Sequence, residues 1–423
     1  MNKFLTHYQS AIGSLNYVAF ILLVMSLAFP WSFSQPLFAI WLIAWLLEGR
    51  WLSRKNLRFD KTTVPVLLLC GFVVWEAISL LWTQDLSSGL SELARHLPVF
   101  ALLLISLFGG NAHYKSYRIK TALMAGSLMA VVSYCVVVYW HAHTGTLHRQ
   151  WPEFSYWTLF GEGPVHYLKH RLYLCLVLLL AVFYSGDVYR HYITRYRKCP
   201  TMTLVVIADA ILLTAICLSG SRTSIMLLPV LGLMYLYIQS PKKYRWYILS
   251  GFIVLVVTGA TVLMRYNWRF QSMQEDLEVL AKRPDSLSNI KEPRVYIWST
   301  VIRHADEYGV VGLGAGSSDS FLERCYEQDH YLQSFGSHNN YLYVWMDFGY
   351  IGLVYLLIAL AAIPFFHTGR ARYDAAFACV IFGGGMFTEN LLTMMSSLYI
   401  LYALIALIQM EQREEDSLPP VRP

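Results

Sequence analysis

Apolar runs about as long as a bilayer is thick recur along nearly the whole chain, and they constrain its fold more than any other feature. A helix needs about 20 mostly apolar residues to cross the hydrocarbon core of a membrane. Hydrophobic residues make up 56% of the 423 residues and charged residues only 14%, and the mean hydropathy is +0.43. We find about twelve such runs, centred near residues 22, 41, 73, 103, 130, 178, 210, 231, 255, 348, 381 and 402. The sequence therefore predicts an all-α polytopic membrane protein.

Basic residues in the short loops predict which way the chain faces, because loops on the cytoplasmic side are enriched in lysine and arginine. If the N-terminus is cytoplasmic, the inner loops hold Arg50, Arg54, Lys55, Arg58, Lys61, Lys115, Arg118, Lys120, Arg190, Arg195, Arg197, Lys198, Lys242, Lys243, Arg245, Arg370 and Arg372. The short loops on the other side hold only Arg95, Arg149, Lys169, Arg171 and Arg222. We therefore expect both termini in the cytoplasm.

The longest segment between spans predicts where the chain does its work. We expect nine transmembrane helices over 1–264, one large outer loop over 265–337, three more helices over 338–410 and a cytoplasmic tail over 411–423. The N-terminal segment carries a single lysine, Lys3, and no small-residue cleavage site before Pro30, so we expect the first span to remain in the mature protein. Of the seven cysteines, only Cys325 is expected outside, which excludes a disulfide there.

Within the large loop, the segments 274–283 and 292–309 have the pattern of short amphipathic helices. In the second helix, Arg294 and Trp298 are four residues apart and share one face. An apolar stripe through Ile297, Val301 and Ile302 can lie on the membrane surface. The glycine-rich run Gly312 to Gly316 follows, but it lacks a preceding strand, a third fingerprint glycine and a GK[ST] sequence. We therefore reject a nucleotide-binding loop.

The run GSHNNYLYVWMDFGYIGL, which starts at Gly336, places a histidine and two asparagines where the large loop re-enters the membrane. A histidine has an ordinary pKa of about 6.5 and can accept a proton at neutral pH. His338 is therefore a candidate general base, with Asn339 in support. The alternative is that His338 only caps a transmembrane helix.

An unusual arginine lies in LSGSRTS, where two predicted spans are joined by almost no loop. Ser221 and its neighbours offer hydroxyls and backbone amides beside Arg222, which suits an oxyanion such as a phosphate. Arginine binds phosphate oxygens with a planar fork and stays charged. The alternative is an arginine that reaches the headgroups and only anchors the helix.

These motifs resemble a known family. LSGSR between two spans, Arg294-x-x-x-Trp298, GLGAG, and HNNYL followed by GYIG are similar to the O-antigen ligase and O-antigen polymerase superfamily of bacterial envelope enzymes. The motifs span roughly the C-terminal half of the chain. The ligase group is favoured because it resembles this chain in having its main loop between the ninth and tenth spans.

The resemblance implies a metal-independent, inverting glycosyltransferase with a GT-C-type fold and no cofactor. It would move O-antigen from undecaprenyl pyrophosphate to a sugar of the lipid A core, at the periplasmic face of a Gram-negative inner membrane. His338 would be the general base. Arg222 and Arg294, with Lys169 and Arg171, would hold the pyrophosphate, supported by Ser221 and Trp298. A basic helix end explains Lys169 and Arg171 equally well, and the sequence offers no metal-ligand spacing and no nucleic-acid partner.

Two alternatives remain. An O-antigen polymerase or a protein O-oligosaccharyltransferase of the same superfamily would use similar motifs. A lipid or glycan transporter would instead use the acidic residues predicted inside spans, which are Glu76, Asp209, Asp347 and Glu389. Against a transporter, the two halves of the chain show no repeat and no broken helices at matching positions.

Overall fold

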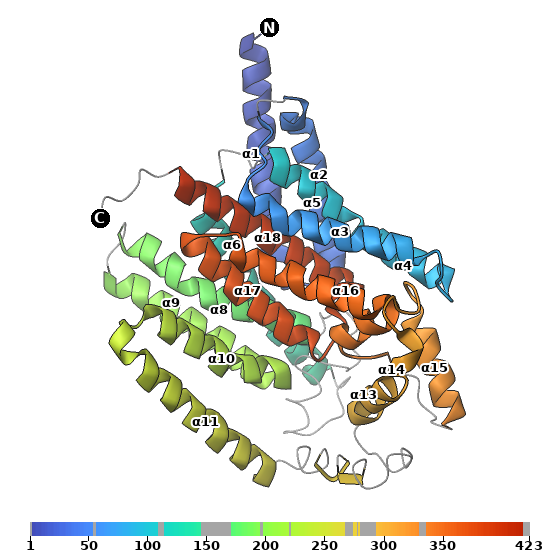
Figure 1. The fold of residues 1–423 in the computed structure, drawn as a ribbon. Helices are drawn as coiled ribbons and strands as arrows, with labels where there is room; N and C mark the ends of the chain where they lie inside the picture. The colour runs from blue at the N-terminus through green and yellow to red at the C-terminus, as the bar shows by residue number, and fades with distance from the viewer. Residues whose placement is uncertain are drawn as a thin grey trace.

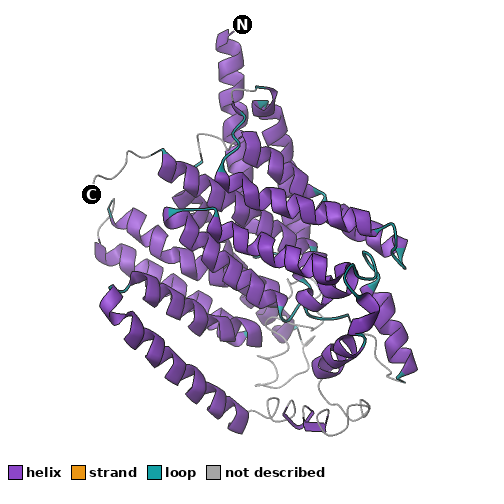
Figure 2. Ribbon diagram, viewed as in Figure 1, coloured by secondary structure: helices purple, strands orange, loops and turns teal. Residues whose placement is uncertain are grey.

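We describe a computed structural model of the chain, in which residues 2–53, 56–108, 114–144, 171–194, 198–219, 221–266, 274–276, 278–279, 293–329 and 336–417 are placed. The regular structure in these segments is helical, and none of them contains a strand (Figure 2). The all-α class predicted from the apolar runs is confirmed.

Every predicted span centre lies inside a helix. These helices are α1 (Asn2–Ser26), α2 (Trp31–Glu48), α3 (Val64–Ser79), α5 (Pro98–Phe108), α6 (Ser116–His143), α8 (Arg171–Ile193), α9 (Lys198–Leu218), α10 (Arg222–Gln239), α11 (Arg245–Tyr266), α16 (Asn340–Phe365), α17 (Gly369–Met386) and α18 (Met395–Asp416) (Figure 1). Shorter elements join them: η1 (Arg50–Leu52), η3 (Lys61–Thr63), α4 (Leu86–His96), η4 (Lys242–Tyr244) and η6 (Leu391–Thr393). The last helix continues past residue 410, where we expected the tail to begin.

Six segments of the described chain are long and apolar enough to cross a membrane: Lys61–Ser79, Leu86–Phe108, Ser116–Trp140, Arg171–Ile193, Pro200–Leu218 and Asn340–Phe365. The chain is therefore a multi-pass membrane protein. The count of about twelve spans stays a prediction, as does the GT-C-type fold. Some helices are too charged to qualify; for example, α17 holds Arg370, Arg372 and Asp374 among its 18 residues.

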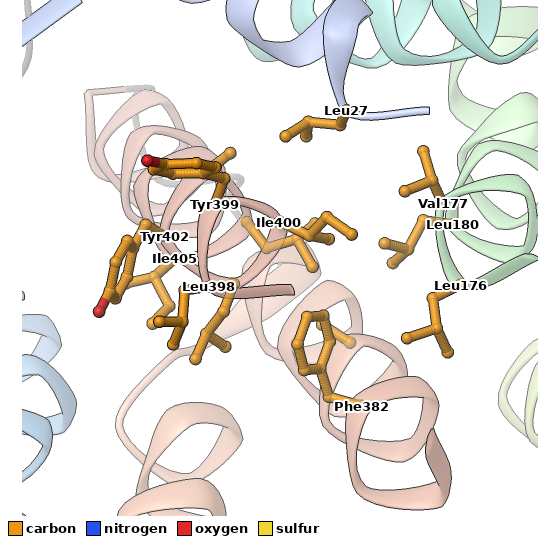
Figure 3. Close-up of a cluster of buried hydrophobic side chains, with 14 of the residues drawn as sticks. Leu27, Leu176, Val177, Leu180, Phe382, Leu398, Tyr399, Ile400, Tyr402 and Ile405 are labelled. Atoms are coloured by element: carbon orange, nitrogen blue, oxygen red, sulfur yellow. The ribbon is translucent and has the colours of Figure 1, made fainter. Parts of the chain in front are cut away.

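The core of the bundle forms around α18, which is buried along almost its whole apolar length. It packs against helices that include α2, α5, α6, α8 and α17. In Figure 3, Ile400 lies among Val177 and Leu180 of α8 and Phe382 of α17. In contrast, α11 packs against α10 and exposes an apolar surface, as expected of a helix that faces lipid.

The large loop contributes a small helical layer beside the start of α16, made of α13 (Pro293–Arg303), α14 (Ala305–Tyr308) and α15 (Ser318–Gln328) (Figure 1). The second predicted amphipathic helix is thus confirmed, with a break at His304. Of the first, 274–276 and 278–279 are described, and they are helical. The layer has its own hydrophobic cluster, in which Ile297 and Val301 are fully buried with Leu322 and Met346.

The membrane-surface role that we expected for the stripe is therefore wrong for Ile297 and Val301, whereas Ile302 is 62% exposed. Hydrophobic periodicity shows that a helix face will be buried, but it does not say what buries it. Here α15 and α16, and not lipid, cover Ile297 and Val301.

The backbone of the glycine run, Gly312 to Gly316, packs closely against the backbone of other segments. Gly312, Gly314 and Gly316 all have positive φ angles, of 79°, 95° and 75°. A Cβ atom at Gly314 would lie 2.4 Å from the Cα of Thr83, and one at Gly312 would lie 2.3 Å from the carbonyl oxygen of Asp347. The Asp347 carboxylate accepts hydrogen bonds from the backbone N–H groups of Gly316, at 3.0 Å, and Ser318, at 2.8 Å. The glycines thus serve close packing between the loop, the α3–α4 turn and α16.

Candidate active site

A polar pocket of about 550 Å³ lies where the helical layer meets the ends of the membrane helices. Its lining comes from four parts of the chain: α4 with the residue before it, the start of α15 with the glycine run before it, the loop that precedes α16, and the segment after α17. The lining residues are Asp85, Ser87, Ser88, Ser91, Glu92, Arg95, Gly316, Asp319, Gly336, His338, Glu389, Asn390, Thr393 and Met394. Of the predicted site residues that the structure describes, His338 is the one that lines this pocket.

His338 lines this pocket and is held in an unusual conformation. Its φ angle of 44° is the one positive value among the non-glycine residues of the described segments. Backbone strain of this kind is often found at functional sites. The Nδ1 atom of His338 lies 3.2 Å from Oε2 of Glu389, and the imidazole is 38% exposed. The side chain is therefore both oriented by a carboxylate and open to a ligand.

Asn339, and not His338, caps the helix that follows. Its side-chain oxygen accepts hydrogen bonds from the backbone N–H groups of Tyr341, at 3.0 Å, and Leu342, at 3.2 Å. Asparagine is among the preferred residues at this position because it satisfies N–H groups that have no partner within the helix. The alternative interpretation of His338 as a simple cap is therefore wrong.

The loop that carries His338 is tied to the segment that carries Glu389. The hydroxyl of Ser337 donates to Oδ1 of Asn390 at 2.9 Å, and the backbone N–H of Leu392 donates to Oδ1 of Asn340 at 2.9 Å. Trp298 of α13 also holds this loop, because its indole N–H donates to the carbonyl of Ser337 at 3.2 Å.

Arg294 reaches the Glu389 turn from α13. One guanidinium nitrogen lies 3.1 Å from the carbonyl oxygen of Thr388 and 3.5 Å from Oε1 of Glu389. His338 and Arg294 thus contact different oxygens of one carboxylate. The predicted i,i+4 pair has a clear structural role, since Arg294 contacts the Glu389 turn while Trp298 holds the His338 loop.

The other predicted phosphate contacts that the structure describes, Arg222 and Arg171, do not line the polar pocket. Arg222 is exposed at the first residue of α10, and the hydroxyl of Thr223 lies 2.7 Å from that of Thr388. The start of α10 therefore touches the turn that Arg294 binds. Arg171 is half-buried at the first residue of α8. Lys169 lies outside the described residues.

Ser221 does not present its hydroxyl to a ligand, as an oxyanion cradle would require. The residue is buried, and its hydroxyl lies 2.8 Å from that of Ser224. Its backbone N–H donates to the hydroxyl of Ser219 at 3.1 Å. Ser221 therefore shapes the start of α10, and Arg222 is the residue there that remains accessible.

Comparison with known proteins relates part of the chain to a protein family. Residues 207–357 match the family model described as O-antigen ligase. This segment of the chain is therefore similar to the O-antigen ligase and polymerase superfamily. Members of the superfamily are glycosyltransferase-like enzymes of O-antigen pathways. A search of curated proteins finds no match to the chain.

The segment that matches the O-antigen ligase family includes Arg222, Arg294, Trp298 and His338 but ends before Glu389. The pocket thus combines a superfamily domain with residues from α4 and from the chain after α17. Arg95, on α4, donates to the carbonyl of Thr393 at 2.6 Å and so joins these two outside contributions.

Sequence reasoning missed several residues of this pocket. The sequence marks Glu389 as a charge inside a span and gives no reason to place it in the site. Arg95 is predicted only as an outer basic residue, and no motif singles out Glu92 or Asp319. Their one signal is polarity near an outer helix end.

Among the other acidic residues considered for a transporter, Glu76 lies 2.7 Å from Nδ1 of His96, and Asp209 accepts from Ser185 at 2.8 Å.

Two carboxyl groups at the rim titrate differently. Asp319 is exposed to the pocket, yet desolvation by the surrounding protein raises the pKa of its carboxyl above the ordinary value, and the nearby Arg95 and His338 oppose this. Hydrogen bonds from the backbone and side chain of Ser88 lower the pKa of Asp85. The charged form of Asp85 is therefore stabilised at a helix N-terminus, whereas the charged form of Asp319 is partly desolvated.

Among the described residues, one cluster of three carboxylates is spaced closely enough to hold a metal ion. It is formed by Asp187, Asp374 and Glu411. The ammonium group of Lys120 lies at its centre, 2.8 Å, 2.5 Å and 2.7 Å from the three carboxylates. Lys120 thus supplies the positive charge that this group needs. None of the three lines the polar pocket, and metal-independent chemistry there stays a prediction.

Proposed function

We propose that the protein is an O-antigen ligase, which transfers a glycan from undecaprenyl pyrophosphate to a sugar of the lipid A core. The observation that carries this proposal is the shared carboxylate of Glu389, which holds a candidate base and a candidate phosphate-binding arginine side by side at a polar pocket. Transfer from a lipid pyrophosphate needs both groups near the anomeric carbon.

The arginines would bind the leaving group. As the bond between the anomeric carbon and the pyrophosphate breaks, negative charge grows on the pyrophosphate oxygens. Arg294 is 40% exposed and already anchored by the Glu389 turn, so it can stabilise this charge without reorganising. The start of α10 touches the same turn, which makes Arg222 the second phosphate contact, and Arg171 and Lys169 would add to it.

His338 would accept the proton from the acceptor. If its Nδ1–H donates to Glu389, the lone pair of the neutral imidazole lies on Nε2. Nε2 would take the proton of the acceptor hydroxyl while the hydroxyl oxygen attacks the anomeric carbon. The glycosidic bond forms, the bond to pyrophosphate breaks, and undecaprenyl pyrophosphate leaves with its electron pair. One such displacement inverts the configuration, and Glu389 stabilises the imidazolium that results.

The positions of the basic loops support a site on the outer face of the membrane. His338, Arg294 and Arg222 belong to the predicted outer side, whereas Lys120 and Arg370 belong to the predicted inner side. We propose that the protein resides in the inner membrane of a Gram-negative bacterium, with both termini in the cytoplasm and the pocket facing the periplasm.

The test is to identify the product. Purified protein is mixed with a lipid-linked glycan and with lipid A core, in the presence of EDTA. A ligase gives a glycan-bearing lipid A core, and the metal-independent account requires that chelation leaves the rate unchanged. Longer lipid-linked glycan would show a polymerase, transfer to an added protein would show an oligosaccharyltransferase, and unchanged lipids would favour a transporter.

A further inference from the structure

The pocket that contains His338 has the wrong charge for the donor's pyrophosphate. Among the residues that the structure describes, four carboxylates line it, those of Asp85, Glu92, Asp319 and Glu389, against one guanidinium, that of Arg95, and the imidazole of His338. Arg294 and Arg222 are not among the lining residues. Phosphate oxygens would be repelled inside the pocket and attracted to the arginines outside it.

We propose that this pocket is the acceptor-sugar site, and that it selects neutral or amine-bearing sugars over phosphorylated or acidic ones. The proposal rests on the glycosyl transfer proposed above. Sugar hydroxyls and ammonium groups donate hydrogen bonds, which carboxylates accept, whereas an ionised phosphate at neutral pH mainly accepts them. The hydroxyls of Ser87, Ser88 and Ser91 add groups that can both donate and accept.

Asp319 is the carboxylate best placed to make this selection. The other three acidic side chains are engaged: Glu389 by His338 and Arg294, Asp85 by Ser88, and Glu92 by the hydroxyl of Tyr343. Asp319 is exposed to the pocket and makes no hydrogen bond or ion pair with another described residue.

The surroundings hold Asp319 close to the reacting groups. It lies on the first turn of α15, within the electrostatic reach of both His338 and Arg95. The backbone of Gly336 passes beside it, since a Cβ atom at Gly336 would lie 3.1 Å from Oδ1 of Asp319. An acceptor hydroxyl at His338 would therefore bring its own sugar ring alongside this carboxylate.

The experiment compares acceptors that differ in one group. Lipid-linked cores ending in a neutral hexose, a 2-amino hexose or a phosphorylated hexose are given to wild-type protein and to Asp319→Asn, and kcat/KM is measured for each. Glu327→Gln is the matched control, because Glu327 is an exposed acid two turns further along α15 and does not line the pocket. Wild-type protein should disfavour the phosphorylated acceptor by at least roughly ten-fold, which corresponds to about 1.4 kcal/mol.

Asp319→Asn should lower the ratio of kcat/KM for the neutral acceptor to kcat/KM for the phosphorylated acceptor several-fold. Glu327→Gln should leave this ratio unchanged. Equal kcat/KM for the neutral and phosphorylated acceptors in the wild type would overturn the proposal. A ratio that Asp319→Asn does not change, in correctly folded protein, would overturn the role of Asp319.

A second measurement separates this proposal from the proposed function. Binding of the same three acceptors to wild-type protein is measured without donor. If no glycolipid forms but the neutral and amino acceptors still bind more tightly than the phosphorylated one, the transfer reaction is wrong and the pocket's selectivity stands. If all three bind equally, the selectivity is wrong whatever the reaction.

Discussion

Nδ1 of His338 lies 3.2 Å from Oε2 of Glu389, although 51 residues separate them in the sequence. The other oxygen of the same carboxylate lies 3.5 Å from a guanidinium nitrogen of Arg294. One acidic residue thus fixes the distance between a candidate base and a candidate phosphate ligand, so a change at Glu389 should disturb both.

Glu389→Gln should lower turnover by about ten- to a hundred-fold, since a hydrogen bond to a charged group is worth about 1.5–3 kcal/mol. The amide keeps the shape of the side chain but cannot stabilise an imidazolium. Turnover of bound donor is measured in the purified variant, with Glu327→Gln as the control for loss of an acidic charge elsewhere. An unchanged turnover would show that Glu389 does not act on the reaction.

A double variant shows whether Glu389 acts through His338. In a His338→Ala background, the further change Glu389→Gln should cost much less turnover than it does in the wild type, because the imidazolium that it stabilises is already gone. Equal losses in the two backgrounds would mean that Glu389 acts independently of His338, for example through Arg294.

Trp298→Phe should lower turnover with little loss of stability. It removes the hydrogen bond to the carbonyl of Ser337, worth about 1 kcal/mol, which corresponds to roughly five-fold in rate if the loop must hold His338 in place. Turnover is measured alongside thermal unfolding in detergent.

Trp345→Phe is the matched control for this change. Trp345 packs against the same hydrophobic cluster, and its indole nitrogen has no hydrogen-bond partner among the described residues. Equal losses of turnover in the two variants would show that ring packing matters and that the bond to Ser337 does not.

Gly312→Ala should prevent correct folding. The added Cβ atom would lie 2.3 Å from the carbonyl oxygen of Asp347 in a backbone with φ of +79°, so the glycine run could not pack against α16. Membrane abundance of correctly folded protein is measured, with Gly232→Ala as control because a Cβ atom there would meet nothing within 4 Å. Normal abundance of Gly312→Ala would contradict the close packing.

Asp85→Ala should destabilise the protein by about 0.5–2 kcal/mol, because Asp85 accepts a hydrogen bond from the Ser88 N–H at the start of α4. Asp85→Ser should keep most of the stability, since serine is also a good cap. The pKa of Asp85 is lowered in the folded protein, so its contribution is present above the ordinary value of about 3.9 and is lost as the pH falls below it. A stability difference from wild type that stays constant down to about pH 3 would contradict this role.

Hydrophobic patterning predicts much of the fold, but it does not predict which partner buries a given helix face. Apolar runs located the long helices, and the polar motifs located His338, Arg294 and Trp298. Periodicity could not show that α15 and α16, and not lipid, bury Ile297 and Val301. That outcome depends on how the large loop folds back onto the bundle.

The candidate site was harder to predict than the fold for the same reason. Glu389, Arg95 and Asp319 reach the pocket from segments far apart in the sequence, and none lies in a motif with a recognisable spacing. A carboxylate near a helix end looks the same in the sequence whether it orients a base or faces solvent. Only the packing of α4, α15 and the segment after α17 brings these three residues to His338.

The most direct test of the central claim compares His338→Ala with Arg294→Ala in correctly inserted protein, measuring affinity for the lipid pyrophosphate donor and turnover of bound donor. His338→Ala removes the proton acceptor, so turnover should fall by ~10²–10⁴ while donor affinity stays near normal. Arg294→Ala removes a phosphate contact worth about 1.5–3 kcal/mol, so donor affinity should fall as well, and Arg294→Lys should restore it only in part. If His338→Ala loses donor affinity as severely as Arg294→Ala while its turnover of bound donor is unchanged, His338 binds the donor and the general-base account is wrong.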